Sequence, residues 1–274
     1  MSFFLRLRDL LISPFGVLLA HRRTIEAFVR QDIRARYVAS VLGLSWAVIQ
    51  PLTLLILYTF IFSYVLKVRY GAEGTTASFG AYLFCGLLPW FAFSESVARS
   101  ASILIVHTNL IKKVVFPSGI LPAYVVVSAI VTELFGLAVF CIIVALFYKG
   151  LGWHVLLLPV VMVVQFLLTM GVAWFVSSIN VFLRDVGQAL GLVLTAWMFL
   201  TPIFYPPDLI PERFRFVTVI NPMHYIVQAY RDLILDQRLP TFPDVLTMLG
   251  MALLSFVFGY WFFRRSQKAF AEVL

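Results

Sequence analysis

Charged residues are scarce in this 274-residue chain. Asp, Glu, Lys and Arg make up 12% of it, against about 25% in a soluble globular domain. Hydrophobic residues reach 62%, where about 45–50% is usual. This composition excludes a soluble enzyme and a disordered chain, and it leaves a polytopic membrane protein.

Cysteine is also rare, which excludes a disulfide-stapled secreted domain. The two cysteines, Cys85 and Cys141, both lie inside apolar runs, where cysteine behaves as a small hydrophobic residue. We expect no disulfide. No cleavable signal peptide is visible, because the first long apolar run begins near Leu44, behind many arginines and beyond the reach of a signal sequence.

Catalytic and nucleotide-binding motifs are missing. The glycine-containing stretch 71–76 (GAEGTT) lacks the lysine of a phosphate-binding loop, and HExxH, GxSxG and CxxC do not occur. The four histidines are scattered, and none has a carboxylate at metal-ligand spacing. We therefore expect no catalytic residues, no metal site and no cofactor bound by this chain, so that a partner must supply any energy. An intramembrane enzyme remains an alternative without a candidate site.

Long apolar runs are what the chain has in abundance. Crossing the hydrocarbon core as a helix takes roughly 20 residues. Six runs qualify: Leu44–Leu66, Phe79–Val106 (with Pro89 as an expected kink), Ile120–Phe147, Val155–Phe182, Val186–Phe204 and Val245–Phe263. The sequence predicts an all-α polytopic membrane protein with six transmembrane helices. We expect one transmembrane domain, residues 1–274, with a cytoplasmic amphipathic region (1–42), a membrane domain (43–264) and a cytoplasmic tail (265–274).

The basic residues predict the orientation. With six spans both ends lie on one side, and that side receives 14 of the 21 lysines and arginines. Because positive residues accumulate in cytoplasmic flanks, both termini are expected to be cytoplasmic. The net charge of +8 then reflects contact with anionic lipid headgroups and not with nucleic acid.

Two stretches before the first span are amphipathic. In residues 3–11 Phe and Leu recur at helical spacing, and in Thr24–Tyr37 the arginines Arg23, Arg30 and Arg34 fall on one edge of a helix. Such helices lie in the membrane interface. They serve either as charged anchors or as a docking surface for a partner.

The segment Tyr205–Thr241 is too rich in proline for a span and too apolar for a solvated loop. It is expected to form re-entrant helices on the outer side, between spans 5 and 6. Non-helical backbone at membrane depth is tolerated where protein or a water-filled cavity covers it. A cavity lining is therefore plausible there.

Ionisable residues inside spans are candidates for function. Glu133 stands in the middle of the third run, as a proton carrier or substrate contact or as a structural carboxylate bonded to a neighbouring helix. Glu95 and Arg99 are spaced to form a helical ion pair, which either is local or lies at the mouth of a channel. Gln165 of the fourth span is expected to form interhelical hydrogen bonds.

Tryptophan and tyrosine in the spans allow two interpretations. Residues such as Trp46, Tyr58, Trp90 and Trp197 form either an interfacial belt or a path for sugars, whose C–H faces stack on aromatic rings. A sliding polymer suits the second, because stacking demands no fixed register.

Four stretches together resemble the permeases of ABC-type polysaccharide exporters. Residues 29–51 (VRQDIRARYVASVLGLSWAVIQP) resemble their entry helix and first span, and 109–117 (NLIKKVVFP) their cytoplasmic coupling helix. Residues 180–185 (NVFLRD) match the loop after the fourth span. Residues 201–222, with the following MHYIVQAYRDLIL, are similar to their extracellular gate helices.

The resemblance implies a function and a set of partners. Such permeases sit in the bacterial inner membrane as homodimers, bind two copies of a cytoplasmic ABC ATPase that carries ATP and Mg, and export undecaprenyl-linked polysaccharide (O-antigen, teichoic acid or capsule). A drug or lipid exporter of the same architecture is the alternative.

The resemblance also implies three groups of site residues. The ATPase-coupling residues would be Asn109, Lys112, Lys113, Phe116, Pro117, Arg30, Asp32 and Arg34. The substrate path would include Arg36, Tyr37, Trp46, Tyr58, Trp90, Glu95, Arg99 and Trp197. The extracellular gate would comprise Phe204, Tyr205, Asn221, Pro222 and Tyr225.

The topology can be tested by cysteine-accessibility labelling. We expect cysteines placed at Ser2 and Glu272 to react with an impermeant reagent only in permeabilised cells, because both ends carry the positive excess. A cysteine at Glu73 should react in intact cells. Labelling of both termini from outside would contradict six spans with cytoplasmic ends.

Overall fold

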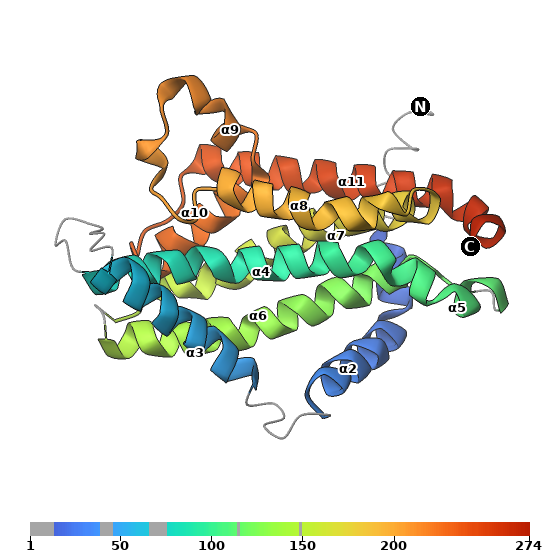
Figure 1. The fold of residues 1–274 in the computed structure, drawn as a ribbon, viewed down its shortest axis with the longest axis horizontal. Helices are drawn as coiled ribbons and strands as arrows, with labels where there is room; N and C mark the ends of the chain where they lie inside the picture. The colour runs from blue at the N-terminus through green and yellow to red at the C-terminus, as the bar shows by residue number, and fades with distance from the viewer. Residues whose placement is uncertain (1–13, 39–45, 66–75, 114–115, 148–149) are drawn as a thin grey trace.

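The computed structural model describes residues 14–38, 46–65, 76–113, 116–147 and 150–274 (Figure 1). Every regular element in these ranges is helical, and they contain no strand. The all-α prediction is therefore confirmed for this part of the chain. The predicted N-terminal helix over 3–11 lies outside the described residues.

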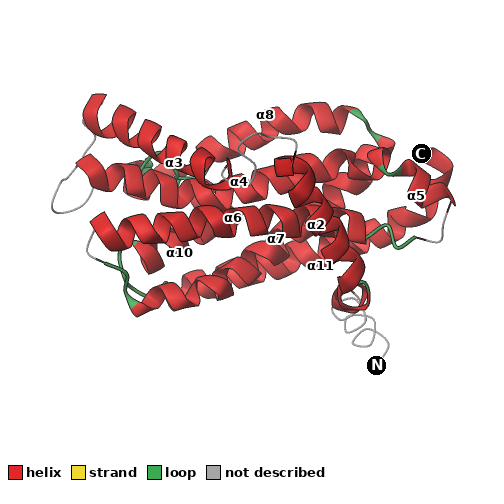
Figure 2. Cartoon of the chain, turned by 90° about the horizontal axis from the view of Figure 1, so that it is seen from below, coloured by secondary structure: helices red, strands yellow, loops and turns green. Residues whose placement is uncertain are grey.

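Four helices are long and apolar enough to cross a membrane, and they run side by side (Figures 1 and 2). They are α4 (Thr76–Val106), α6 (Ile120–Phe147), α7 (Leu158–Phe182, preceded by the 3-10 turn η3, Trp153–Leu157) and α11 (Phe242–Val273). These correspond to the second, third, fourth and sixth predicted spans. The predicted first and fifth spans are the shorter helices α3 (Trp46–Tyr58, continued by the π-helix η2, Thr59–Val65) and α8 (Asp185–Leu200).

Helix α8 ends earlier than the apolar run that predicted it. The run continues to Phe204, but Thr201 adopts extended backbone angles (φ −88°, ψ 130°). Pro202 follows it, and the residue before a proline is disfavoured in the helical conformation. The chain therefore leaves the helix at Leu200.

Helices α7 and α11 pack more closely than any other pair along their length. A Cβ added to Gly171 would overlap the backbone of Ser255 and Phe256, and one added to Gly259 would overlap the backbone of Gly171. The missing side chains thus allow the two backbones to touch, as small residues do between membrane helices. The Ser255 hydroxyl also donates to the Leu168 carbonyl (3.0 Å).

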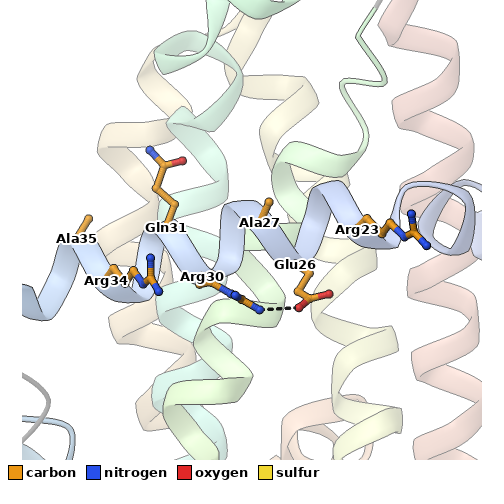
Figure 3. A pocket seen from close by; sticks show the side chains of 7 residues that line it. All are labelled: Arg23, Glu26, Ala27, Arg30, Gln31, Arg34 and Ala35. Atoms are coloured by element: carbon orange, nitrogen blue, oxygen red, sulfur yellow. Dashed lines mark hydrogen bonds and ion pairs between the residues drawn. The ribbon is translucent and has the colours of Figure 1, made fainter.

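Helix α2 (Arg22–Val38) runs across the long helices (Figures 2 and 3). Ile25 and Val29 are buried, and the ring of Phe28 stacks on Tyr124 of α6 at 5.2 Å. Arginines occupy its exposed face. The predicted amphipathic helix over 24–37 is thus confirmed, with its apolar side packed on the protein.

Short helices follow α4 and α8. Helix α5 (Thr108–Lys113) directly continues from α4. After α8 come two 3-10 turns, η4 (Pro207–Leu209) and η5 (Glu212–Phe214), then α9 (Phe216–Val219) and α10 (Pro222–Ile234). The segment Tyr205–Thr241 thus contains the short helices α9 and α10, which meet at Asn221–Pro222. Helix α10 packs against α4, α7 and α11, whereas α9 projects from the bundle (Figure 1).

The close α7–α11 contact predicts the effect of one methyl group. Gly171→Ala should lower the free energy of unfolding by about 1–3 kcal/mol, because backbone atoms cannot move aside as a side chain can. Thermal unfolding of the purified chain in detergent measures this. Gly250→Ala on α11 is the matched control, since an added Cβ there meets nothing within 4 Å. An equal loss in both variants would contradict the interpretation.

Candidate functional site

A cavity of about 760 Å³ lies between α3, α4, α6 and α8, with Arg36 of α2 also in its wall. Its wall along α4 extends from Phe84 to Ala98, which at 1.5 Å per residue is roughly 21 Å of helix. Helix α8 contributes one face: Gly191, Leu194, Thr195 and Met198. The cavity is therefore elongated along the bundle.

The cavity brings together four of the predicted substrate-path residues: Arg36, Trp46, Trp90 and Glu95. Trp197 does not line it but packs edge-on against Trp90, with ring centroids 6.3 Å apart. Tyr58 lies elsewhere, packed against the cluster of Phe79, Tyr82 and Leu83. Its predicted place on the path does not coincide with this cavity. The Tyr37 side chain lies outside the described residues.

Four charged side chains form a ring between α2 and α4. Arg36 contacts Asp32 (3.1 Å) and Glu95 (2.6 Å), and Arg99 contacts Asp32 (2.5 Å) and Glu95 (3.2 Å). The predicted Glu95–Arg99 pair is confirmed, and Glu95 also lines the cavity. Asp32, predicted as an ATPase-coupling residue, turns toward α4 with 15% of its side chain exposed. Sequence reasoning missed this half of the ring, since Asp32 and Arg99 are far apart in the chain.

Glu133 is held by a buried hydrogen-bond network. Gln165 of α7 donates to its carboxylate at 2.8 Å, and the Tyr230 hydroxyl of α10 lies 2.7 Å from its other oxygen. Gln165 also donates to the Pro89 carbonyl of α4 (3.3 Å). Of the two roles open for Glu133, these contacts support the structural carboxylate, although its side chain also reaches the cavity wall. The interhelical bonding predicted for Gln165 is confirmed.

Asn221 joins the end of α8 to the start of α10. Its carbonyl oxygen accepts from the Trp197 indole (2.9 Å) and from the Met223 backbone (3.1 Å), which caps α10. Its amide donates to the Thr201 hydroxyl (2.9 Å). Pro222 occupies the first helical position, where a proline needs no N–H partner. Two predicted gate residues, Asn221 and Pro222, thus form this connection, which we call the α8–α10 joint.

The three aromatic residues predicted for the gate surround this joint. Phe204 stacks on Phe199 with centroids 5.4 Å apart, and the Tyr205 hydroxyl donates to the Phe199 carbonyl at 2.7 Å. The Tyr225 hydroxyl donates to the Val219 carbonyl at 3.1 Å. All three predicted side chains are half-buried.

Arg231 is a residue whose importance the sequence did not reveal. Only 2% of it is exposed. Its guanidinium donates to the carbonyls of Pro202 (2.8 Å) and Ile203 (2.9 Å) and lies 3.5 Å from the centre of the Tyr82 ring. It therefore fixes the chain after α8 to α4 and α10. The signal that the sequence offered was an arginine among apolar residues in the stretch 222–234.

The predicted ATPase-coupling residues divide between two surfaces. On α5, Asn109 and Lys112 are exposed, and the Lys113 side chain lies outside the described residues. Phe116 and Pro117 are half-buried, and the Phe116 ring packs edge-on against Phe28 of α2 at 6.3 Å. The coupling segment therefore contacts α2 directly.

The outer face of α2 is a shallow basic groove (Figure 3). Arg30 and Arg34 are exposed on it, and Arg30 pairs with Glu26 at 2.9 Å. The arginines on this face are those that helical periodicity predicted along one edge of the helix.

A family model described as the ABC-2 type transporter matches residues 23–235. The chain belongs to the ABC-2 type transporter family. The match covers α2, the cavity and the α8–α10 joint, so all of these belong to the ABC-2 region.

Curated relatives align with about nine-tenths of this chain. An O-antigen export system permease protein RfbA from Klebsiella pneumoniae is 32% identical over 253 residues, 89% of this chain and 92% of that one. A protein of the same name from Myxococcus xanthus is 28% identical, covering 92% and 95%. The polysialic acid transport protein KpsM of Escherichia coli is 21% identical, covering 90% and 94%.

The charge ring predicts a local loss of order when one member is neutralised. Asp32→Asn should weaken the attachment of α2 by about 1–2 kcal/mol, between the values for exposed and fully buried pairs. Hydrogen exchange of α2 amides should accelerate accordingly. Glu26→Gln, which breaks an exposed pair on the same helix, should change exchange by much less. Equal acceleration in both variants would show that the ring does not hold α2.

Proposed function

We propose that this chain is the permease subunit of an ABC exporter that moves polysaccharide across the cytoplasmic membrane. The observation that carries the proposal is the elongated cavity with Trp46 and Trp90 in its wall, in a family whose relatives are named for O-antigen export and polysialic acid transport. Aromatic faces at intervals suit a chain of sugars that slides past them.

A drug or lipid as cargo fits the cavity less well. Ser94, Thr132 and Thr195 place hydroxyl groups in its wall, beside the carboxyl groups of Glu95 and Glu133. The three hydroxyls donate within their own helices, so an apolar cargo would leave their remaining acceptor lone pairs without a donor, which costs free energy. A hydroxylated cargo supplies such donors.

The proposed membrane arrangement keeps six crossings and cytoplasmic ends. The 13 residues of α3 and 7 of η2 follow one another without a break, about the 20 that a span takes. Helix α8 with its 16 residues is completed by the segment up to Phe204. Helix α10, buried within the bundle, would be the re-entrant element.

Energy would come from two copies of a separate ATPase at the end that holds α5 and α2. Lys112 and Asn109 are exposed there, and Phe116 connects this segment to α2. Movement of α5 would thus reach α2, then the Arg36–Glu95 contact and the cavity wall. The exposed arginines of α2 (Figure 3) would meet the diphosphate of a lipid-linked substrate.

A homodimer would complete the path. Helix α8 leaves Leu192, Val193 and Phe199 more than half exposed, a surface suited to lipid or to a second copy. Two α8–α10 joints facing each other would then bring Phe204, Tyr205 and Tyr225 to a seal that keeps the resting pore closed to ions.

A complementation experiment tests this function. Cells without this chain should accumulate lipid-linked polysaccharide inside and lose it from the surface, and the wild-type chain should restore export. Lys112→Glu should reduce export at least about tenfold, because it reverses a charge on the exposed coupling surface proposed to meet the ATPase. The measurements are the amount of polysaccharide at the cell surface and the amount of ATPase that copurifies with the chain.

Lys268→Glu is the matched control, since Lys268 is also exposed, on the C-terminal part of α11. It should leave both measurements unchanged. Normal export in the Lys112→Glu variant would remove the coupling assignment. Normal surface polysaccharide without the chain would contradict the proposed function itself.

A further inference from the structure

Each of the three serine and threonine hydroxyls in the cavity wall already donates a hydrogen bond. Ser94 donates to the Phe91 carbonyl (3.2 Å), Thr132 to Ser128 (3.0 Å) and Thr195 to Gly191 (2.8 Å), each within its own helix. A hydroxyl that donates inward presents only acceptor lone pairs to the cavity. These three side chains therefore need a ligand that donates hydrogen bonds.

The charged residues of the cavity wall also disfavour an anionic cargo. Among the described lining residues, Arg36 is the one cationic side chain and Glu95 is acidic, while Glu133 is buried with both carboxyl oxygens already hydrogen-bonded. Arg36 is already paired with Asp32 and Glu95. A row of carboxylates or phosphates entering the cavity would lose water without gaining a cation in exchange, which is costly.

A sugar without ionised groups meets both conditions. Each of its hydroxyls can donate to Thr132 or Thr195 and accept elsewhere. Its C–H faces can cover Trp46 and Trp90, which line the same cavity. An anionic sugar shares the stacking but brings acceptor groups to a wall of acceptors.

We propose that this cavity selects neutral, hydroxyl-rich glycan chains and disfavours polyanionic ones. The proposal rests on the proposed export function and adds the class of polysaccharide to it. The basic groove of α2 lies outside this cavity, so a diphosphate on the lipid end of a substrate does not conflict with a neutral polymer inside.

Binding to the purified full chain in lipid nanodiscs tests the selectivity. The probes are dextran oligomers and dextran sulfate oligomers of the same length, which differ only in charged groups. Calorimetry at physiological salt should give at least about tenfold tighter binding of the neutral oligomer, because the sulfated one meets a wall of acceptors whose lining cation, Arg36, is already ion-paired.

Two variants assign the effect to the cavity hydroxyls. Thr132→Val with Thr195→Val should weaken binding of the neutral oligomer by about tenfold, as expected for two lost hydrogen bonds, and leave weak binding of the sulfated oligomer unchanged. Thr53→Val is the matched control, because Thr53 is exposed on α3, bonds its own helix in the same way and does not line the cavity. Thr195→Lys should instead strengthen binding of dextran sulfate by about tenfold at low salt.

The possible outcomes distinguish a failure of the selectivity for neutral glycans from a failure of the proposed export function. Equal or tighter binding of dextran sulfate by the unaltered chain would overturn the selectivity and leave polysaccharide export standing. A loss in Thr53→Val as large as in the double variant would overturn the role of the cavity hydroxyls. Binding of neither oligomer would overturn the cavity as a glycan path, and the selectivity with it.

Discussion

The buried guanidinium of Arg231 is the contact on which the interrupted half of the bundle depends. Helix α8 stops at Leu200, so the carbonyls of Pro202 and Ile203 have no helical partner, yet both residues are buried. A polar backbone group out of water must find a donor. Arg231 supplies two, and its face covers the Tyr82 ring of α4. A helix can therefore break inside an apolar environment without losing order.

Contacts continue from this break toward the other end of the molecule. Asn221 holds Trp197, which packs on Trp90 in the cavity wall. Further along the same wall, Glu95 pairs with Arg36 of α2. The cavity is therefore connected, through Trp90 and Glu95, both to the α8–α10 joint and to the helix that contacts the coupling segment. A change of shape at either end has a direct physical route to the lining.

The sequence predicted what depends on neighbours in the chain. Unbroken apolar runs located α4, α6 and α7, and helical periodicity located α2 with its buried and basic faces. The cavity was not predictable in the same way, because it forms where helices distant in sequence face one another. Trp46 and Tyr58 looked equivalent as aromatic residues of one span, yet only Trp46 turns into the cavity. Likewise the Glu95–Arg99 spacing was visible, whereas the contacts of Asp32, predicted as a coupling residue, and of Arg231 join parts of the chain that are distant in sequence.

The backbone contact between Gly171 and Gly259 has a consequence for how the protein is made. Helix α7 is synthesised long before α11, the last helix of the chain. Until α11 enters the membrane, the close-fitting surface around Gly171 and the buried Trp174 has only lipid or the insertion machinery beside it. The surface of α7 around Gly171 is therefore completed only when α11 packs against it, so the two helices depend on each other for this close fit.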